Sequence, residues 1–165
     1  MKCIIYTSNA LQHFVPSTLQ ALAEDAAKRN ETTSITGYLF FQCDKFFQYI
    51  EGDETAIDKL MNSIRKDTRH QVIRHFTDNT LKQRRFPYWS MALDYSKEPN
   101  YVRIESLLIK HLMMANQSYD DIEAWAHCIW QQVNKLAMLY RINMIESQDK
   151  SHVTSSQIVH DESLK

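Results

Sequence analysis

The sequence predicts an α+β fold in which a mixed five-stranded sheet carries two helices on one face and a helical hairpin on the other. Two observations lead to this prediction. Apolar residues recur at strand or helix spacing in the order strand, helix, strand, strand, helix, strand, with one strand added, and this order is the ferredoxin-like pattern. Two amphipathic helices are predicted after Pro99, and they cover the face of the sheet that would otherwise be open.

Length and composition narrow the possible classes of protein. A chain of 165 residues with a hydrophobic fraction of 44% can form one core with an appendage. A formal net charge of −1 argues against a strongly electrostatic nucleic-acid binder. The N-terminus has neither a long apolar run nor a signal-peptide layout, so we expect a soluble, cytoplasmic protein without a membrane partner.

Cysteine, glycine and histidine content exclude several kinds of site. The widely spaced Cys3, Cys43 and Cys128 form no metal or redox motif and are predicted to be free thiols. With only two glycines, Gly37 and Gly52, the chain cannot form a glycine-rich phosphate loop. The seven histidines pair with no cysteine or acid at metal-ligand spacing, so neither a metal site nor enzyme chemistry is predicted.

The first predicted elements are a strand over residues 2–7 and a helix that ends near Asn30. The strand is rich in β-branched and aromatic residues and places Tyr6 on its core face. Ser17 and Gln20 have the spacing of a capping box at the start of the helix. Asn30 continues the apolar stripe of the helix, so its amide is either a capping group or a contact to a ligand.

Two strands over residues 34–42 and 45–52 are predicted to form a hairpin through a two-residue turn. Gly37 marks a place where something approaches the backbone closely. Gln48 projects to the apolar face of its strand, although a buried amide without partners costs about 1–3 kcal/mol. Its partner is therefore a backbone group, a water or a bound heteroaromatic ligand.

Asp53 starts a second amphipathic helix, which is predicted to reach about Lys66 because apolar residues recur there at helical spacing. Acidic residues at its start favour the positive end of the helix dipole. The helix ends in the sequence Asp-Thr-Arg-His at residues 67–70. This cluster is either a solvated helix end or a set of groups suited to phosphate or ribose hydroxyls.

The last two strands of the sheet are predicted over residues 71–77 and 88–95. A polar link that contains two arginines connects them. If the fifth strand begins at residue 88, Trp89, Met91 and Leu93 share one of its faces, because side chains alternate along a strand.

The two C-terminal helices have apolar stripes that predict a hairpin packed on the sheet. In the second helix Trp130, Met138 and Leu139 lie outside the stripe, so we expect a second contact surface for a sister subunit or another protein. The stripes consist of Ile104, Leu107, Leu108, His111, Leu112 and Ala115 in the first helix, and of Ile122, Trp125, Ala126, Ile129, Val133, Leu136, Ala137 and Tyr140 in the second.

These elements predict three parts of the chain. Residues 1–97 form the sheet with its two helices, and residues 98–145 form the helical hairpin, which acts as a cap, an oligomer contact or a partner interface. Residues 146–165 are rich in Ser, Thr, Gln, Asp and Lys without periodicity, and are therefore predicted to be a disordered tail.

Several short motifs occur in one order along residues 1 to about 95. They read YTS at 6–8, RN at 29–30, ITG at 35–37, FFQYIEG at 46–52, DTRH at 67–70 and RFPYWSM at 85–91. In residue type, order and spacing this set resembles the BLUF family, which are blue-light sensors that use a flavin, normally FAD. The C-terminal helices resemble short, single-domain members in plan more than in sequence.

The resemblance implies a photoreceptor with the flavin ring between the first two helices. Tyr6 would donate an electron and a proton to the excited flavin, and Gln48 would bridge Tyr6 and the flavin. Light would change the hydrogen bonds of Gln48 by rotation, tautomerisation or both, and Trp89 and Met91 would carry the signal to the C-terminal helices. The other implied cofactor contacts are Leu22, Arg29, Asn30, Ile35, Asp67, Arg69 and His70. The sequence departs from the family at Ser63, where some members carry a basic residue.

The expected output is a change in assembly or in binding of a protein partner, because no effector domain is evident in the sequence. Two alternatives remain open at this stage. One is a ferredoxin-like binding module without a cofactor, in which Gln48 and Asn30 are satisfied core amides. The other is a flavin-dependent enzyme, which needs an open site for a substrate, whereas the bulky Phe46, Leu22, Ile35 and Trp89 suggest a closed site.

Overall fold

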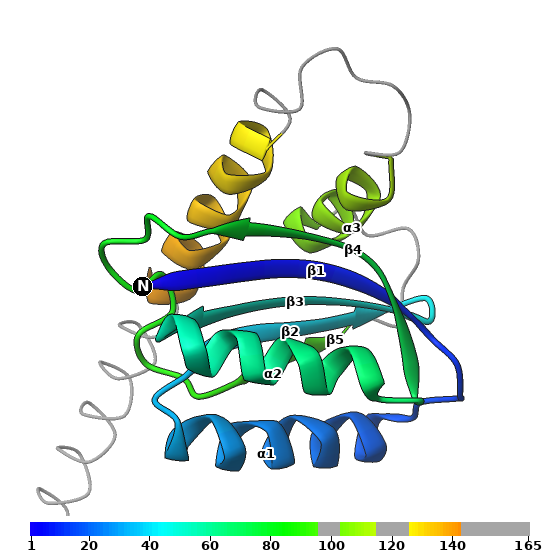
Figure 1. Cartoon of the computed structure of the whole chain (residues 1–165). Helices are drawn as coiled ribbons and strands as arrows, with labels where there is room; N and C mark the ends of the chain where they lie inside the picture. Colours follow the sequence, from blue (N-terminus) through cyan, green and yellow to red (C-terminus); the bar gives the residue numbers. More distant parts are fainter. Residues whose placement is uncertain (96–102, 115–125, 143–165) are drawn as a thin grey trace, which may run out of the picture.

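The computed structural model of the chain describes residues 1–95, 103–114 and 126–142 (Figure 1). Residues 126–142 are helical, and we call them the C-terminal helix. The predicted hairpin connection, the predicted tail and the boundary near residue 97 lie outside the described residues and stay predictions. The elements are β1 (Lys2–Ala10), α1 (Pro16–Thr32), β2 (Thr36–Gln42), β3 (Lys45–Gly52), α2 (Glu54–Lys66), β4 (His70–Asp78), β5 (Ala92–Tyr95) and α3 (Ile104–Met114).

The five strands form one mixed sheet in the order β4-β1-β3-β2-β5. All neighbouring pairs are antiparallel except β2 and β5, which are parallel. Helices α1 and α2 cover one face, and α3 and the C-terminal helix cover the other (Figure 1). The predicted α+β, ferredoxin-like fold class with an added strand is therefore confirmed.

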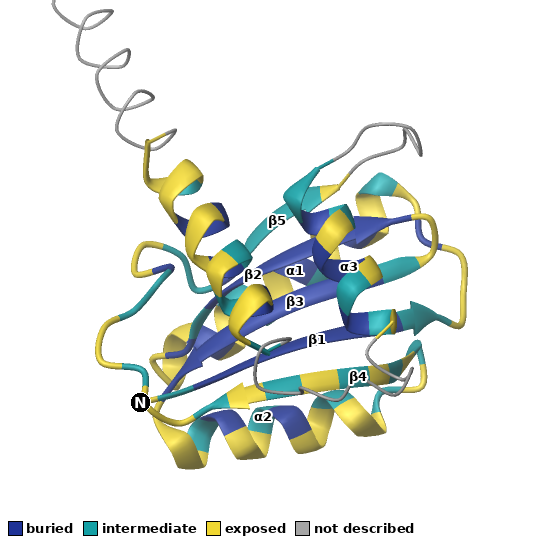
Figure 2. Ribbon diagram, turned by 90° about the horizontal axis from the view of Figure 1, so that it is seen from above, coloured by how far each residue is buried: buried dark blue, intermediate teal, exposed yellow. Residues whose placement is uncertain are grey.

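Each face of the sheet packs against its own hydrophobic core. On β2, Tyr38 and Phe40 face α3 and the C-terminal helix, whereas Leu39 and Phe41 face α1 and α2. Because both faces are covered, the central strands are buried along most of their length, whereas β4 at the edge alternates between half-buried and exposed residues (Figure 2).

The predicted hairpin between β2 and β3 is confirmed. Its turn residues Cys43 and Asp44 have positive φ values of 48° and 57°, which is the backbone of the two-residue turns that match the twist of antiparallel strands. The turn sets a register in which Leu39 lies opposite Gln48. It thereby helps to place Gln48 on the face of the sheet that α1 and α2 cover.

The start of α1 differs from the prediction. The helix begins at Pro16 with Val15 as its N-cap, and no capping box forms between Ser17 and Gln20. The Thr18 hydroxyl accepts from the Val15 backbone N–H at 3.0 Å and donates to the Val15 carbonyl at 2.9 Å. Proline favours the first helical position because its fixed φ suits a helix, so the helix starts earlier than the polar residues suggest.

The fifth strand is shorter than predicted, and this changes the position of Trp89. Strand β5 begins only at Ala92, and residues 85–91 are irregular. Trp89 packs against the core beneath the C-terminal helices, whereas Met91 and Leu93 pack on the opposite face. The prediction that all three share a face is wrong, because strand alternation does not extend back to residue 89.

The C-terminal elements follow the predicted pattern only in part. In α3 the buried residues are Glu105, Leu108, Ile109 and Leu112, while Leu107, which was predicted to face the core, is 39% exposed. In the C-terminal helix the buried residues match the predicted stripe, and they are Ile129, Val133, Leu136 and Ala137. Ala115, Ile122 and Trp125 lie outside the described residues. No helix in the described ranges is long and apolar enough to cross a membrane.

The close approach predicted at Gly37 is to the neighbouring strand. A Cβ atom on Gly37 would lie 2.3 Å from the Tyr49 carbonyl oxygen, which belongs to the backbone and cannot move freely. We expect Gly37→Ala to lower the free energy of unfolding by about 1–3 kcal/mol. Gly52→Ala is the matched control, because the nearest atom there, at 3.3 Å, is a side-chain carbon of Ile35. Equal losses for the two variants in urea unfolding would contradict this explanation.

Candidate functional site

A cavity of about 70 Å³ lies between α1, α2 and the sheet, and an adjoining cavity of about 350 Å³ shares Arg29, Asn30 and Leu60 with it. All predicted cofactor contacts line the first cavity except Ile35, which lines the second. The first cavity is lined by Tyr6, Phe14, Leu22, Ala26, Arg29, Asn30, Leu39, Phe46, Gln48, Leu60, Ile64, Asp67, Arg69 and His70.

The side-chain amide of Gln48 has two polar partners, one on β1 and one in the segment before β5. Tyr6 lies directly opposite Gln48 in the antiparallel pairing of β1 with β3, and its hydroxyl donates a hydrogen bond to Gln48 Oε1. Gln48 Nε2 in turn lies 3.4 Å from Met91 Sδ, to which it donates. Tyr6 is 2% and Gln48 6% exposed, so these contacts form out of reach of bulk water. The amide therefore connects β1 with the segment before β5.

Burial also strengthens the preference of the Tyr6 phenol for its protonated form. Desolvation raises the pKa of the Tyr6 phenol well above its usual value, and the carboxylate of Asp67 raises it further. The phenol therefore stays protonated at neutral pH. A protonated hydroxyl is required for the donation to Gln48 Oε1.

Asp67 and Arg69 form an ion pair where α2 leads into β4. Arg69 Nε donates to the Asp67 carboxylate at 2.9 Å, and the Arg69 backbone N–H donates to it at 2.9 Å. These bonds lower the pKa of Asp67 to about 2, although its partial burial opposes the shift. The pair places one fixed carboxylate and one guanidinium at the rim of the cavity.

His70 completes this end of the cavity. Its ring stacks near the Tyr6 ring at a centroid distance of 6.3 Å and meets the edge of Phe46 at 5.9 Å. Its Nδ1 is buried and has no hydrogen-bond partner within the described part of the chain. A buried polar atom of this kind normally needs a partner, which a ligand or an ordered water can supply.

The pKa of His70 predicts a pH dependence of stability. Burial lowers this pKa below its usual 6.5; the Arg69 guanidinium also lowers it, and the Asp67 carboxylate partly offsets the shift. On acidification through pH 6.5 the unfolded chain therefore binds a proton at His70 before the folded protein does, so the free energy of unfolding falls.

The measurement is urea unfolding at neutral pH and at roughly pH 5.5. We expect His70→Gln to lose less stability on acidification than the natural protein does. His13→Gln, at an exposed position, serves as the control. An unchanged loss in His70→Gln would contradict the effect of burial on this histidine.

The segment before β5 connects the cavity to the opposite face of the sheet. Asn30 Nδ2 donates to the Ser90 carbonyl at 2.8 Å, and the Gly37 backbone N–H donates to the Trp89 carbonyl at 3.1 Å. The Trp89 ring does not line the cavity and instead packs edge-on against Tyr140 of the C-terminal helix, with centroids 5.6 Å apart. The structure thus places Met91 beside Gln48 and Trp89 beside the C-terminal helix.

Sequence reasoning missed several residues of the two cavities. The spacing of apolar residues could have found Leu60 and Ile64, which lie on the apolar face of α2, whereas Phe14 lies in a segment without periodicity. Ser63 lines the adjoining cavity, and Lys59 places a positive charge one helical turn before it. The other missed residues are Ala26 and Leu39 in the first cavity and Thr33, Asp53, Thr55 and Ala56 in the adjoining one.

The residues of the cavity fit a planar heteroaromatic ligand. Apolar walls from α1, α2 and the sheet surround a small set of polar groups, which are two amides, a phenol, an imidazole, two guanidinium groups and a carboxylate. Such groups can donate to and accept from the edge of a ring system such as a flavin. Within the described ranges no group of histidine, cysteine and acidic residues could hold a metal ion.

Comparison with known proteins gives consistent matches. The family model for sensors of blue-light using FAD, BLUF, matches residues 1–92. Over 90 residues the chain is 29% identical to the blue light- and temperature-regulated antirepressor BluF of Escherichia coli (strain K12). The aligned region is 54% of this chain and 22% of the relative.

Two solved structures are similar in fold as well as sequence. A bacterial light-regulated adenylyl cyclase gives a TM-score of 0.57 at 27% identity over 80% of this chain and 39% of the cyclase. The BLUF protein BlrB in its dark state gives a TM-score of 0.55 at 27% identity over 78% of this chain and 92% of BlrB. The chain spans less than half the length of the antirepressor and of the cyclase.

Proposed function

The chain belongs to the BLUF family of flavin-based blue-light sensors, and on this premise we propose that it is a photoreceptor that binds FAD between α1 and α2. The observation that carries the proposal is the hydrogen-bonded series from the Tyr6 hydroxyl through the Gln48 amide to Met91. This series joins a one-electron donor, a proton acceptor and a switchable amide inside one buried site.

When bound, the flavin supplies the absorption of blue light and the capacity to accept an electron. Tyr6 would provide that electron, and its hydroxyl proton would leave along the existing hydrogen bond to Gln48 Oε1. The electron and the proton would both return to Tyr6 once the Gln48 amide has rearranged, so that no net oxidation remains. The Gln48 amide then rotates, tautomerises or does both, because it can present either an oxygen or a nitrogen to the same neighbour. The contact of Gln48 Nε2 with Met91 Sδ changes as a result, and this is the first displacement outside the cavity.

The lining residues have separate roles in holding the cofactor. Asn30 and Arg29 would bind the carbonyl and nitrogen edge of the ring, and Leu22 and Ile35 would pack against it, since all four line the two cavities. Asp67, Arg69 and His70 would face the ribityl chain and phosphate of the cofactor. Release of the bound cofactor and chromatography against FAD and FMN standards identifies which flavin the protein holds.

We also propose that the output passes through protein contacts rather than through turnover of a substrate. Met138, Leu139 and Ile142 on the C-terminal helix are 64%, 48% and 41% exposed, so an apolar surface is available for a second copy or a protein partner. The name of the similar Escherichia coli protein, an antirepressor, supports an output of this type. Trp89 and Met91 carry the change from Gln48 to this helix.

The test is the visible absorption spectrum of the purified protein in the dark and under blue light. We expect a flavin spectrum that shifts slightly to the red on illumination and recovers in the dark. A protein that stays colourless after addition of FAD would show that the cavity holds no flavin. A flavin spectrum without a reversible shift would contradict the proposed switch at Gln48.

A further inference from the structure

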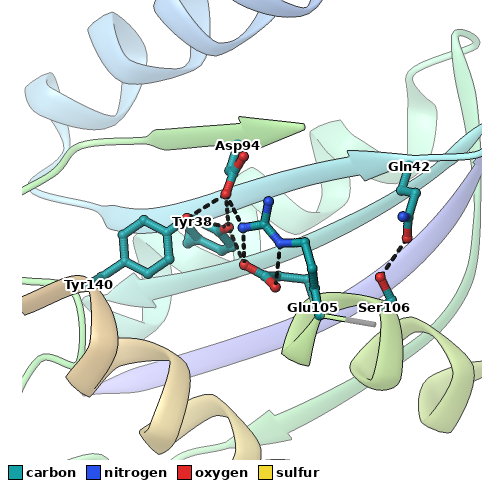
Figure 3. A network of polar contacts seen from close by, with 7 residues as sticks. Tyr38, Gln42, Asp94, Glu105, Ser106 and Tyr140 are labelled. Atoms are coloured by element: carbon teal, nitrogen blue, oxygen red, sulfur yellow. Dashed lines mark hydrogen bonds and ion pairs between the residues drawn. The ribbon is translucent and has the colours of Figure 1, made fainter. Parts of the chain in front are cut away.

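A polar cluster lies on the face of the sheet opposite the cavity (Figure 3). We call it the tyrosine–carboxylate cluster, and it consists of Tyr38, Asp94, Arg103, Glu105 and Tyr140. Tyr38 on β2 donates to Glu105 Oε1 at 2.8 Å, and Tyr140 donates to Asp94 Oδ2 at 2.8 Å. The two tyrosine hydroxyl oxygens lie 2.8 Å apart. Arg103 forms ion pairs with both carboxylates. The cluster therefore joins β2, β5, α3 and the C-terminal helix.

The two tyrosines of the cluster carry two hydroxyl protons, but three pairs of oxygen atoms lie 2.8 Å apart. These pairs are Tyr38 with Glu105, Tyr140 with Asp94, and Tyr38 with Tyr140. Each tyrosine carries one hydroxyl proton, and the two ionised carboxylates carry none. Burial raises the pKa of both phenols, so neither proton is lost at neutral pH. When Tyr38 donates to Glu105, Tyr140 can donate to Asp94 or to Tyr38 but not to both at once. With Tyr38 donating to Glu105, the cluster therefore has two arrangements, in which the Tyr140 hydroxyl is bonded either to Asp94 on β5 or to Tyr38 on β2.

The two arrangements differ in energy because their acceptors differ, and because the inner part of the cluster is buried, whereas Asp94 and Arg103 are partly exposed. Glu105 is 2% exposed and Tyr38 is fully buried, and the Arg103 guanidinium lies 5.2 Å from the centre of the Phe40 ring. Hydrogen bonds in such surroundings are stronger than in water, and a carboxylate is a better acceptor than a phenol oxygen. The resting arrangement is therefore the one in which Tyr140 donates to Asp94.

Residues 89–94 connect the cavity to the hydrogen bond of Tyr140. Met91 lies beside Gln48 on one face of the sheet, whereas Trp89 and Asp94 contact Tyr140 on the other. Within the described part of the chain, strand β5 is at the edge of the sheet and pairs only with β2, over four residues. A small displacement at Met91 can therefore move Asp94 relative to Tyr38, which lies on the neighbouring strand β2.

We propose that Tyr140 exchanges its hydrogen bond between Asp94 and Tyr38, and that this exchange transmits a displacement of β5 to the C-terminal helix. The inference rests on the proposed function, because the displacement starts at the contact of Gln48 with Met91. The exchange is a two-state element that both the cavity and the helix can bias, which is the physical requirement for coupling between them.

Tyr140→Phe tests the exchange, because it removes the hydroxyl and keeps the ring that packs on Trp89. Tyr95→Phe is the matched control, since it removes the same group from an exposed side chain on β5. Two readouts are compared in the dark and under blue light: the flavin absorption shift and the amide hydrogen exchange of residues 126–142. We expect all three proteins to show the flavin shift. The light-dependent change in exchange should occur in the natural protein and in Tyr95→Phe, and be lost in Tyr140→Phe.

The other outcomes separate the two proposals. A natural protein without a flavin shift removes the proposed function and the exchange with it. A normal flavin shift without any light response in residues 126–142, or a response that persists in Tyr140→Phe, overturns the exchange alone. Should Tyr140→Phe fail to fold, Asp94→Asn replaces it with the same expectation, because it weakens the resting acceptor without changing its size.

The rate of dark recovery distinguishes exchange from loss of packing. Tyr38→Phe removes the alternative acceptor and leaves Tyr140 with Asp94, so recovery should be faster than in the natural protein. Tyr140→Phe releases β5 from the helix, so recovery should be slower than in the natural protein. Changes in the same direction in both variants would show that these tyrosines only support packing.

Discussion

Gln48→Ala is expected to abolish the light-induced red shift while the protein still binds its flavin. The variant removes both the oxygen that accepts from Tyr6 and the nitrogen that contacts Met91 at 3.4 Å, so no switchable amide remains. The other polar and apolar groups of the cavity, which hold the ring, are unchanged. The measurement is the absorption spectrum of the flavin-loaded variant in the dark and under blue light.

Gln42→Ala is the matched control for this variant. Gln42 is also a nearly buried glutamine of the same hairpin, but its side chain accepts from Ser106 on α3, on the far side of the sheet. We expect Gln42→Ala to show a normal light-induced red shift. Gln48→Ala also leaves the buried Tyr6 hydroxyl without an acceptor, so the free energy of unfolding should fall by about 1–3 kcal/mol. A normal shift in Gln48→Ala would refute the role of this amide.

Tyr6→Phe is expected to bind flavin and to form no red-shifted state. The phenyl ring keeps the stacking geometry with His70, but it has no hydroxyl proton to pass to Gln48 Oε1. Removing the donor also leaves a buried amide oxygen unsatisfied, at a cost of about 1–3 kcal/mol in stability. Absorption spectra under continuous blue light measure the first effect, and urea unfolding in the dark measures the second.

Tyr49→Phe provides the comparison that isolates the position of the hydroxyl. Tyr49 is as deeply buried as Tyr6, but it points to the other face of the sheet, where its hydroxyl donates to Glu51 at 2.8 Å. This variant should lose stability and keep the light response. If Tyr6→Phe cycles as the natural protein does, Tyr6 is not the donor.

Local sequence patterns pointed to two amides of the site, and the resemblance to the BLUF family implied the other cofactor contacts. Gln48 is conspicuous because an amide interrupts the apolar face of a strand, and Asn30 because it continues an apolar helical stripe. The structure brings both to one cavity with Tyr6 and His70. That Met91 is a partner of Gln48, while Trp89 is a neighbour of Tyr140, is visible only in three dimensions, because both residues lie in a segment without regular alternation.

Buried carboxylates show the limit of prediction from sequence most clearly. Glu51 is fully buried and accepts from the backbone N–H groups of Arg85 and Phe86 at 2.8 and 2.7 Å. Glu105 is equally removed from water and depends on Tyr38 and Arg103. An acidic residue in an amphipathic pattern indicates solvent, and its burial needs hydrogen-bond donors. Local residues supply some of these donors, but Tyr38 and the backbone of residues 85 and 86 come from distant segments that no local pattern specifies.

The sequence by itself determined the fold class, the two-faced sheet and the faces of most strands, because the spacing of apolar residues along an element is a local property. The tertiary structure alone decided where β5 begins, which of the adjacent residues Leu107, Leu108 and Ile109 are buried, and how the tyrosine–carboxylate cluster joins β5 to the C-terminal helix. These features depend on which surfaces meet across long distances in the chain, and no local pattern specifies that contact.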